Sequence, residues 1–290
     1  MSAISIKAAT TILPDLGKPV PEPKVMELYE SFGGFEAFTD PKITDEMKAL
    51  RNALLAAPNL PSEVFKSILN NTKKVTRQEV TGWGFFSSVA LFKDFSLFKR
   101  FWDINPNGMM LGLYFLEVHA LVLSAEWNSG RLWEPIPMVH SKDCNGSPAH
   151  PDCKSKRFRP DALLDIKATV RNRLIETIDP RVIDLIQEQA LTLSADSRVR
   201  YADSLFVHED HWRLLATDSK REVINTLTTN SFLPAEIAKQ IITTHKTALL
   251  RENIAHHTVD PEVLQIIWNS TKSESIHEEV SMNPFWSKPF

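Results

Sequence analysis

The sequence is poor in glycine and cysteine, and each shortage argues against a class of protein. Only 9 of the 290 residues are glycine, and neither GxGxxG nor GxxxxGK[ST] occurs. The Gly-rich phosphate turns of Rossmann and P-loop proteins are therefore not expected. Two cysteines are too few for a disulfide framework, so a cytoplasmic protein is expected.

Long hydrophobic runs and a strong charge bias are also absent. No apolar run reaches the roughly 18 residues of a membrane span. Residues 1–23 lack the apolar stretch and cleavage site of a signal peptide. The formal net charge of -3 excludes a generally basic nucleic-acid binder and an acidic disordered chain. Neither nucleic acid nor a membrane is an expected partner, and the oligomeric state stays open.

Helical periodicity is what the sequence does contain, along most of its length. Four prolines within residues 1–23 prevent a regular helix and predict an extended N-terminal arm. Residues 24–280 are expected to form one compact all-α domain of about ten helices, followed by an aromatic tail at 281–290. Strand-like alternation is scarce, and no internal repeat of the length typical of solenoids is evident.

A turn and a loop frame the expected central helix. The residues Asn-Pro-Asn-Gly at 105–108 predict a turn. Residues 109–127 are apolar nearly all the way round, which is typical of a buried helix. Residues 134–160 contain five prolines and both cysteines, so they are expected to form a long loop.

Helix-start signals divide the second half of the chain. Pro160 predicts the start of a helix, and Asp179-Pro180 predicts the start of the next. The apolar pattern predicts four further helices, at 196–216, 218–229, 234–257 and 261–280.

Asp161 and Asp165 form the first candidate site. Their i, i+4 spacing places both carboxylates on one helix face, where they can share a Mg²⁺ ion or hold two neighbouring ones. A solvated polar face is the alternative, because Asp161 also lies in the first turn, where the helix dipole favours a negative charge.

Polar residues in the apolar central segment form the second candidate. Glu117, His119 and Glu126 interrupt it, and Asn128 follows. A buried carboxylate is costly unless it is paired or bound to a metal, so Glu126 and Asn128 are further candidate Mg²⁺ ligands. The alternatives are a solvated helix end for Glu126 and a hydrogen-bonded core histidine for His119.

Two other metal sites are conceivable. The loop holds a set of possible zinc ligands whose spacing is not that of a standard zinc finger: His140, Cys144, His150 and Cys153. The alternatives are a disulfide within the loop or two unbound thiols. An ExxxH pair and other Glu and His residues suggest a di-iron site in a helical bundle: Glu117, Glu126, His208, Glu252 and His256.

Cationic residues supply candidate anion ligands. The last ten residues contain Phe285, Trp286 and Phe290 around Lys288. An exposed tail this aromatic is unfavourable, so it is expected to dock and to bring Lys288 to the body of the protein. Arg200 and Tyr201 are a second candidate anion-binding pair; a solvated terminal lysine is the alternative for Lys288.

Sixteen Phe and seven Trp residues suit either ordinary core packing or an aromatic-lined cavity. Such a cavity, with carboxylates for Mg²⁺ and cations for an anion, suits diphosphate chemistry on an isoprenoid. Mg²⁺ would stabilise the departing diphosphate, the closed cavity would exclude water, and ring faces would stabilise a carbocation.

The chain resembles, in outline, the fungal humulene synthases of tropolone sesquiterpenoid pathways. The features that carry the resemblance are its length, its helical pattern, the absence of DDxxD and Lys288 in the tail. The resemblance implies farnesyl diphosphate as substrate, a binuclear magnesium site and a functional lysine near the C-terminus. Only Lys288 is carried over from it; the metal ligands come from the residue chemistry above.

The sequence thus predicts an Mg²⁺-dependent sesquiterpene cyclase of secondary metabolism, a lyase whose partner is an isoprenoid diphosphate. Lys288, Arg200 and Tyr201 would bind the diphosphate. The alternatives are a helical di-iron oxygenase and a non-catalytic helical interaction protein. The last of these predicts no large internal pocket and no functional dependence on the tail.

Overall fold

The computed structural model describes residues 89–122, 124, 130–135 and 156–287, together with residues 27 and 30. Twelve α-helices, one 3-10 turn and two three-residue strands occur in these residues. The predicted all-α class is therefore confirmed, with more helices in the described part alone than the ten expected for the whole chain. No helix in this part is both long and apolar enough to cross a bilayer.

The chain divides into two compact units, where a single compact body was expected. Unit 1 consists of Met1–Leu123 and Val170–Phe206, and unit 2 of Ser124–Thr169 and Val207–Phe290. The division falls inside helix α9 (Pro160–Thr177), so each unit holds part of it. The predicted boundaries after residues 23 and 280 stay predictions.

Unit 1 packs around aromatic rings. Its helices are α6 (Val89–Lys93), α7 (Phe95–Ile104), α8 (Pro106–Val122), the second part of α9, α10 (Pro180–Gln189) and α11 (Ala195–Asp203), with a 3-10 turn at Ala190–Thr192. The ring of Phe98 lies 5.2 Å from that of Phe92 and 5.6 Å from that of Trp102, and all three side chains are buried. Ordinary core packing therefore accounts for these rings.

Capping explains where several of these helices begin. The Asp94 carboxylate accepts from the Leu97 amide at the start of α7, and the Asp179 carboxylate accepts from the Arg181 amide at the start of α10. Both predicted starts, at Pro160 and Pro180, are confirmed.

The predicted turn at residues 105–108 is wrong, because α8 already begins at Pro106. The side chain of Asn105 accepts a hydrogen bond of 3.0 Å from the Gly108 amide, and proline is well suited to a first helical position. The residues that we expected to form a turn therefore start the helix.

Unit 2 contains a short strand pair and a stack of helices. Strands β1 (Trp133–Pro135) and β2 (Lys156–Phe158) pair antiparallel, with Trp133 opposite Phe158. They lie at the two ends of the expected 134–160 loop; its middle is outside the described residues. The helices, after the first part of α9, are α12 (His211–Ala216), α13 (Arg221–Leu227), α14 (Ala235–Thr244), α15 (Ala248–His257), α16 (Pro261–Ser270) and α17 (Glu274–Met282).

Three predicted long helices are each broken in two. Residues 196–216, 234–257 and 261–280 hold the helices α11 and α12, α14 and α15, and α16 and α17 respectively. The backbone turns extended at Thr247 and Ser273, where α15 and α17 begin. Neither break contains glycine or proline, so the apolar pattern alone predicts one continuous helix across it.

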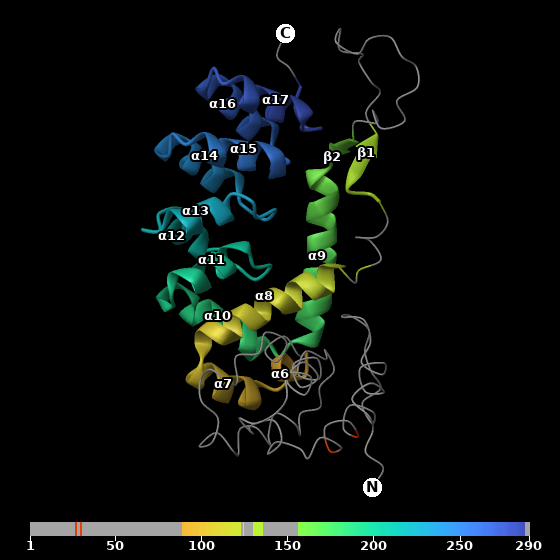
Figure 1. Ribbon diagram of the computed structural model, residues 1–290, viewed down its shortest axis with the longest axis vertical. Coiled ribbons are helices and arrows are strands. Elements are labelled where there is room, and N and C mark those ends of the chain that lie inside the picture. Colours follow the sequence, from red (N-terminus) through yellow and green to blue (C-terminus); the bar gives the residue numbers. More distant parts are fainter. Residues whose placement is uncertain are drawn as a thin grey trace, which may run out of the picture. The chain divides into compact units, whose positions relative to one another are not determined.

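The helices α12 to α17 form three helix pairs stacked on one another (Figure 1). The first helices, α12, α14 and α16, contact each other in a row, and so do the second helices, α13, α15 and α17. This is the arrangement of helical solenoids, in which each pair contacts only its neighbours.

A sequence repeat of one helix pair underlies the stack, which corrects the expectation of no repeat. The second helices begin at Arg221, Ala248 and Glu274, which are almost evenly spaced. Equivalent apolar side chains are buried in each: Val223, Leu250 and Ile276, and Leu227, Ile254 and Val280. In unit 1, α11 begins at Ala195 and continues this spacing, and its buried Ser197 and Tyr201 occupy the same two positions.

Candidate binding site

The two predicted metal ligands on α9, Asp161 and Asp165, have different surroundings. The Arg159 guanidinium forms an ion pair with the Asp161 carboxylate. Burial acts to raise the pKa of Asp161, but the hydrogen bonds from Arg159 and the Ala162 amide and the charge of Arg159 outweigh it, so the pKa lies below its ordinary value. Asp165 is exposed. The described residues contain no group of three or more His, Cys, Asp or Glu side chains that could hold a metal ion.

The other predicted cyclase residues lie in unit 1 or outside the described residues, so their role stays a prediction. Tyr201 is completely buried in unit 1, and its neighbour Arg200 is half-buried. Glu126, Asn128 and Lys288 lie outside the described residues. The candidate zinc ligands His140, Cys144, His150 and Cys153 also lie outside them.

The buried carboxylate of Glu117 is hydrogen-bonded within unit 1. The residue is 4% exposed, and its carboxylate accepts hydrogen bonds from the Ser204 hydroxyl at 2.7 Å and the Leu205 amide at 3.2 Å. These bonds tie α8 to the end of α11 within unit 1 and offset the cost of burying a carboxylate. Sequence reasoning marked Glu117 as unusual but did not foresee these partners.

The other described residues predicted for a di-iron site have partners within unit 2. The rings of His208 and His211 lie 5.4 Å apart, and His208 faces the carboxylate of Asp210 at 3.6 Å. His256 forms an ion pair with Glu279, and Glu252 accepts from the Ser275 hydroxyl at 3.1 Å. Both of the latter contacts join α15 to α17.

A recurrent polar residue lies at the end of the second helix of each pair. After α17, Asn283 is 4% exposed, and its amide donates to the carbonyl oxygens of Ala255 at 2.7 Å and Thr258 at 2.9 Å. Its own carbonyl accepts from the Phe285 amide at 2.9 Å. One carboxamide thus joins the last helix pair to the pair before it. We call the contact region between two consecutive helix pairs a junction.

The same position is Asn230 after α13 and Ser204 after α11. The Asn230 carbonyl accepts from the Phe232 amide at 3.0 Å, and the Ser204 hydroxyl accepts from the Phe206 amide at 3.1 Å. Each contact joins positions i and i+2, as does that between Asn283 and Phe285. The equivalence in bonding supports the repeat register independently of the buried apolar positions.

His257 occupies this position at the end of α15. Aligning the buried Ile254 with Leu227 and Val280 brings His257 level with Asn230 and Asn283. Its Nδ1 atom is buried and has no hydrogen-bond partner. Burial, and then the positive charges of His256 and Lys167, lower the pKa of His257 to about 4, and Glu279 opposes the shift only in part. The imidazole is therefore neutral at neutral pH.

A pocket of about 170 Å³ lies beside His257. Polar residues line one part of it, including Thr228, Asn230, Ser231 and Asp260, and apolar residues line the rest: Leu233, Ala235, Ala238, Ile254 and Val259. The hydroxyl of Ser231 is buried there without a partner, as is Nδ1 of His257. The pocket therefore combines apolar walls with unused hydrogen-bonding atoms.

Aromatic rings flank the imidazole pair on another side. The Phe158 ring, from β2, stacks on His256 at 4.4 Å with an interplanar angle of 10° and meets His257 edge-on at 5.8 Å. The strand pair is thereby attached to the end of α15, which fixes the orientation of both histidines.

A second set of polar contacts stabilises the α14–α15 and α16–α17 pairs. Arg251, 8% exposed, donates through Nη2 to the Ile242 carbonyl at 3.2 Å and through Nε to the Ser270 hydroxyl at 3.1 Å. His277, at the same position of the next pair, donates to the Trp268 and Thr271 carbonyls. These donors satisfy carbonyls at the C-terminal ends of the preceding helices.

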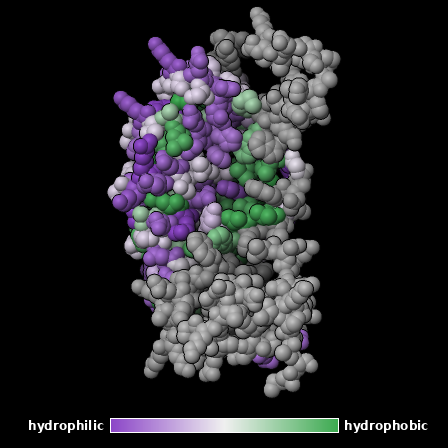
Figure 2. Space-filling view, in the orientation of Figure 1, coloured by the Kyte–Doolittle hydropathy of each residue, from purple (hydrophilic) through white to green (hydrophobic). Residues whose placement is uncertain are grey.

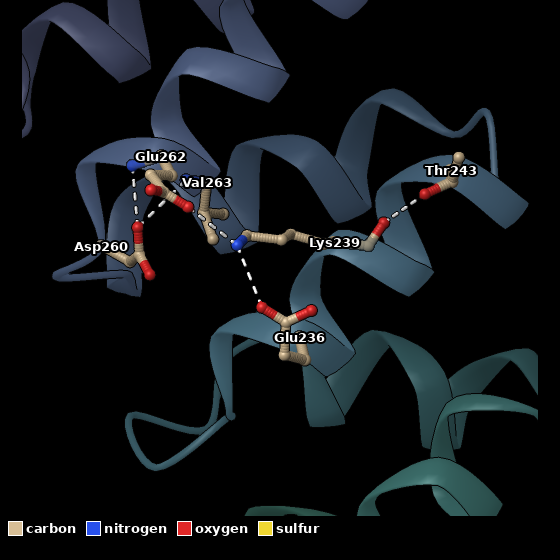
Figure 3. Close-up of polar contacts among 6 residues, drawn as sticks. All are labelled: Glu236, Lys239, Thr243, Asp260, Glu262 and Val263. Carbon is tan, nitrogen blue, oxygen red and sulfur yellow. Dashed lines mark hydrogen bonds and ion pairs between the residues drawn. The ribbon is translucent and has the colours of Figure 1, made fainter.

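Two of the first helices, α14 and α16, are joined by an ion pair. Lys239 on α14 lies 3.0 Å from Glu236 of its own helix and 3.0 Å from Glu262 of α16 (Figure 3). Asp260 accepts from the Glu262 and Val263 amides and so caps α16. The surface over α12 to α17 in Figure 2 is mostly hydrophilic, and its hydrophobic residues form separate small spots.

Of the two described aromatic residues of the tail, Trp286 docks on the body of the unit, whereas Phe285 is 37% exposed. The Trp286 ring stacks on Trp268 at 5.0 Å, and Trp268 stacks on His277 at 4.0 Å. The three rings cover the end of the last helix pair. The contact of Trp286 with α16 gives this part of the tail a structural role.

No family model, curated protein or solved structure matches this chain.

Proposed function

We propose that this chain is a non-catalytic interaction protein whose stack of helix pairs binds another protein. The repeat register carries the proposal: the helices of unit 2 recur at regular spacing, with equivalent buried side chains and equivalent hydrogen bonds. Stacks of this kind present rows of equivalent side chains, which suit extended protein surfaces.

The charges on the last two second helices, α15 and α17, indicate the chemistry of the partner. Helix α17 exposes Glu274 and Glu278 and contains no lysine or arginine. The basic residue of α15, Arg251, is buried and hydrogen-bonded within the stack. A partner segment rich in lysine or arginine would complement this surface, and the attraction would weaken as salt is raised.

Site-specific photo-crosslinking in the source cell tests the proposal. A photoreactive residue at position 249 is suitable because Leu249 on α15 is 45% exposed. We expect one predominant crosslinked protein with a basic segment at the contact. The double variant Glu274→Lys and Glu278→Lys should abolish the crosslink, since it reverses the charge of α17.

Glu209→Lys is the matched control, because Glu209 is exposed in unit 2 but lies outside the stacked helices. It should leave the crosslink intact. A crosslink that survives the double reversal, or the absence of any specific product, would contradict the proposal.

The cyclase predicted from the sequence stays an alternative, and the same purified protein can test it. Incubation with farnesyl diphosphate and Mg²⁺, with an EDTA control and mass spectrometry of the extract, detects a sesquiterpene. An EDTA-sensitive hydrocarbon would replace the interaction function with the cyclase and direct attention to Glu126, Asn128 and Lys288.

A further inference from the structure

The pocket beside His257 is the place where the repeat leaves a hydrogen-bonding site unfilled. At the next junction, Asn283 fills the corresponding site by donating to the Ala255 and Thr258 carbonyls. One repeat earlier in the same register, these two carbonyls correspond to those of Thr228 and Ser231. Both residues line the pocket.

None of the corresponding bonds is made at the His257 junction. Among the described residues, neither the Thr228 nor the Ser231 carbonyl accepts a hydrogen bond from His257. The Ser231 hydroxyl and Nδ1 of His257 are also unpartnered. A single imidazole nitrogen cannot replace the two N–H groups and the carbonyl oxygen that a carboxamide offers.

The unfilled atoms define what a ligand must supply. Two carbonyl oxygens require N–H donors, and the Ser231 hydroxyl and the imidazole can complement an acceptor or a further donor. The Ser231 hydroxyl and Nδ1 of His257 are buried and unpaired, which is costly, so a ligand that pairs them gains affinity. A primary carboxamide supplies two N–H donors and one carbonyl acceptor in a single planar group.

We propose that the pocket lined by Thr228, Ser231 and His257 is a binding site for a primary carboxamide. Its ligand takes the place that the Asn283 side chain occupies at the next junction. The apolar walls, which include Leu233, Ala238 and Ile254, would hold the group attached to the amide. The volume of about 170 Å³ suits a ring, because a cavity of about 150 Å³ holds benzene.

Methyl-detected NMR titration of the full chain tests this site directly. Benzamide is the probe, and the methyl groups of Ala238 and Ile254 report from the pocket wall. Benzoate and benzamidine are isosteric controls, since the first lacks the N–H donors and the second lacks the carbonyl acceptor. We expect saturable shifts with benzamide and at least about tenfold weaker binding of both controls.

The variant His257→Asn supplies the missing carboxamide from the protein itself. It should weaken benzamide binding by at least about tenfold while raising the midpoint of urea unfolding, which shows that the loss is not caused by misfolding. His245→Asn is the matched control, because His245 lies in unit 2 away from the pocket lining. It should bind benzamide like the unmodified protein.

Propionamide, which mimics a glutamine side chain, separates two sources of the ligand. Tighter binding of propionamide than of benzamide would identify a glutamine side chain of a protein, and the reverse order a small aromatic amide. The proposal is overturned if no amide binds saturably, if benzoate or benzamidine binds as well as benzamide, or if His257→Asn binds undiminished. None of these outcomes depends on whether the stack binds a protein partner.

Discussion

The junctions before and after the α14–α15 pair place a polar residue at the same repeat position, but its hydrogen bonds differ. After it, Asn283 donates to two carbonyls of the preceding pair and accepts one amide. Before it, the corresponding residue His257 makes none of these bonds and borders a pocket. The repeat can evidently maintain its stacking with one junction unfilled, so the unfilled junction is free to serve another purpose.

The first helices, α12, α14 and α16, which we call the outer side of the stack, show the same difference between the two junctions. Lys239 and Glu262 join α14 to α16 at the filled junction. The corresponding pair one repeat earlier is Arg213 and Glu236, and among the described residues Arg213 forms no ion pair. The pocket junction is instead held by Asn253, whose amide donates to the Thr228 hydroxyl at 3.1 Å.

Removing the carboxamide at the filled junction should have the largest effect. Asn283→Ala leaves the Ala255 and Thr258 carbonyls without these donors, so we expect the free energy of unfolding to fall by about 2–4 kcal/mol. Urea unfolding followed by tryptophan fluorescence measures it. His257→Ala should cost clearly less, because Nδ1 of His257 has no hydrogen bond to lose; equal losses would contradict the contrast between the junctions.

Acid should affect the pocket junction next most strongly. The pKa of His257 is about 4 in the folded chain against an ordinary 6.5, so the unfolded chain binds more protons between these values. Stability from this group is present above pH 6.5 and is lost as the pH falls towards 4, by about 2–3 kcal/mol.

Comparison of the unmodified protein with His257→Asn at pH 7 and pH 4.5 isolates this contribution. The other titratable groups around the site, His256, Lys167, Glu279 and Asp260, are present in both proteins. The variant should lose less stability on acidification. The same loss in both would show that His257 does not titrate as a buried neutral residue.

Sequence reasoning could predict the helical class and several helix starts, because these depend on local signals. Pro160 and Asp179-Pro180 act through the fixed proline backbone and a capping carboxylate, and both starts are confirmed. In the tail, Trp286 docks as expected, but Phe285 stays exposed.

The breaks within the helix pairs depend on tertiary packing instead. Residues 245–247 and 271–273 are polar but contain no glycine or proline, so nothing local stops the helices there. The predicted helices merged the last two pairs into one helix each and joined α12 to α11 instead of α13, which concealed the repeat. Its buried positions also tolerate Val, Leu and Ile alike. The pocket was beyond prediction, because it arises from hydrogen bonds that one residue of a repeat does not make.

Filling the empty junction should produce a smaller, stabilising effect. His257→Asn places a carboxamide near the Thr228 and Ser231 carbonyls, and we expect the free energy of unfolding at pH 7 to rise by about 1 kcal/mol. The reciprocal Asn283→His should lower it. Thermal and urea unfolding measure both, and a loss of stability in His257→Asn would show that the two junctions are not equivalent.

The ion pairs of the outer side should contribute least of all. Lys239→Met removes both contacts of Lys239, but Glu236 and Glu262 are largely exposed, and exposed pairs stabilise little. We expect a small decrease in the urea midpoint that disappears at high salt, where such pairs are screened. Arg213→Met is the matched control and should have no such salt-dependent effect, because Arg213 has no ion pair within the described part of the chain. If both variants behaved alike, the ion pairs would not distinguish the two junctions. Only the difference between Asn283 and His257 would then remain.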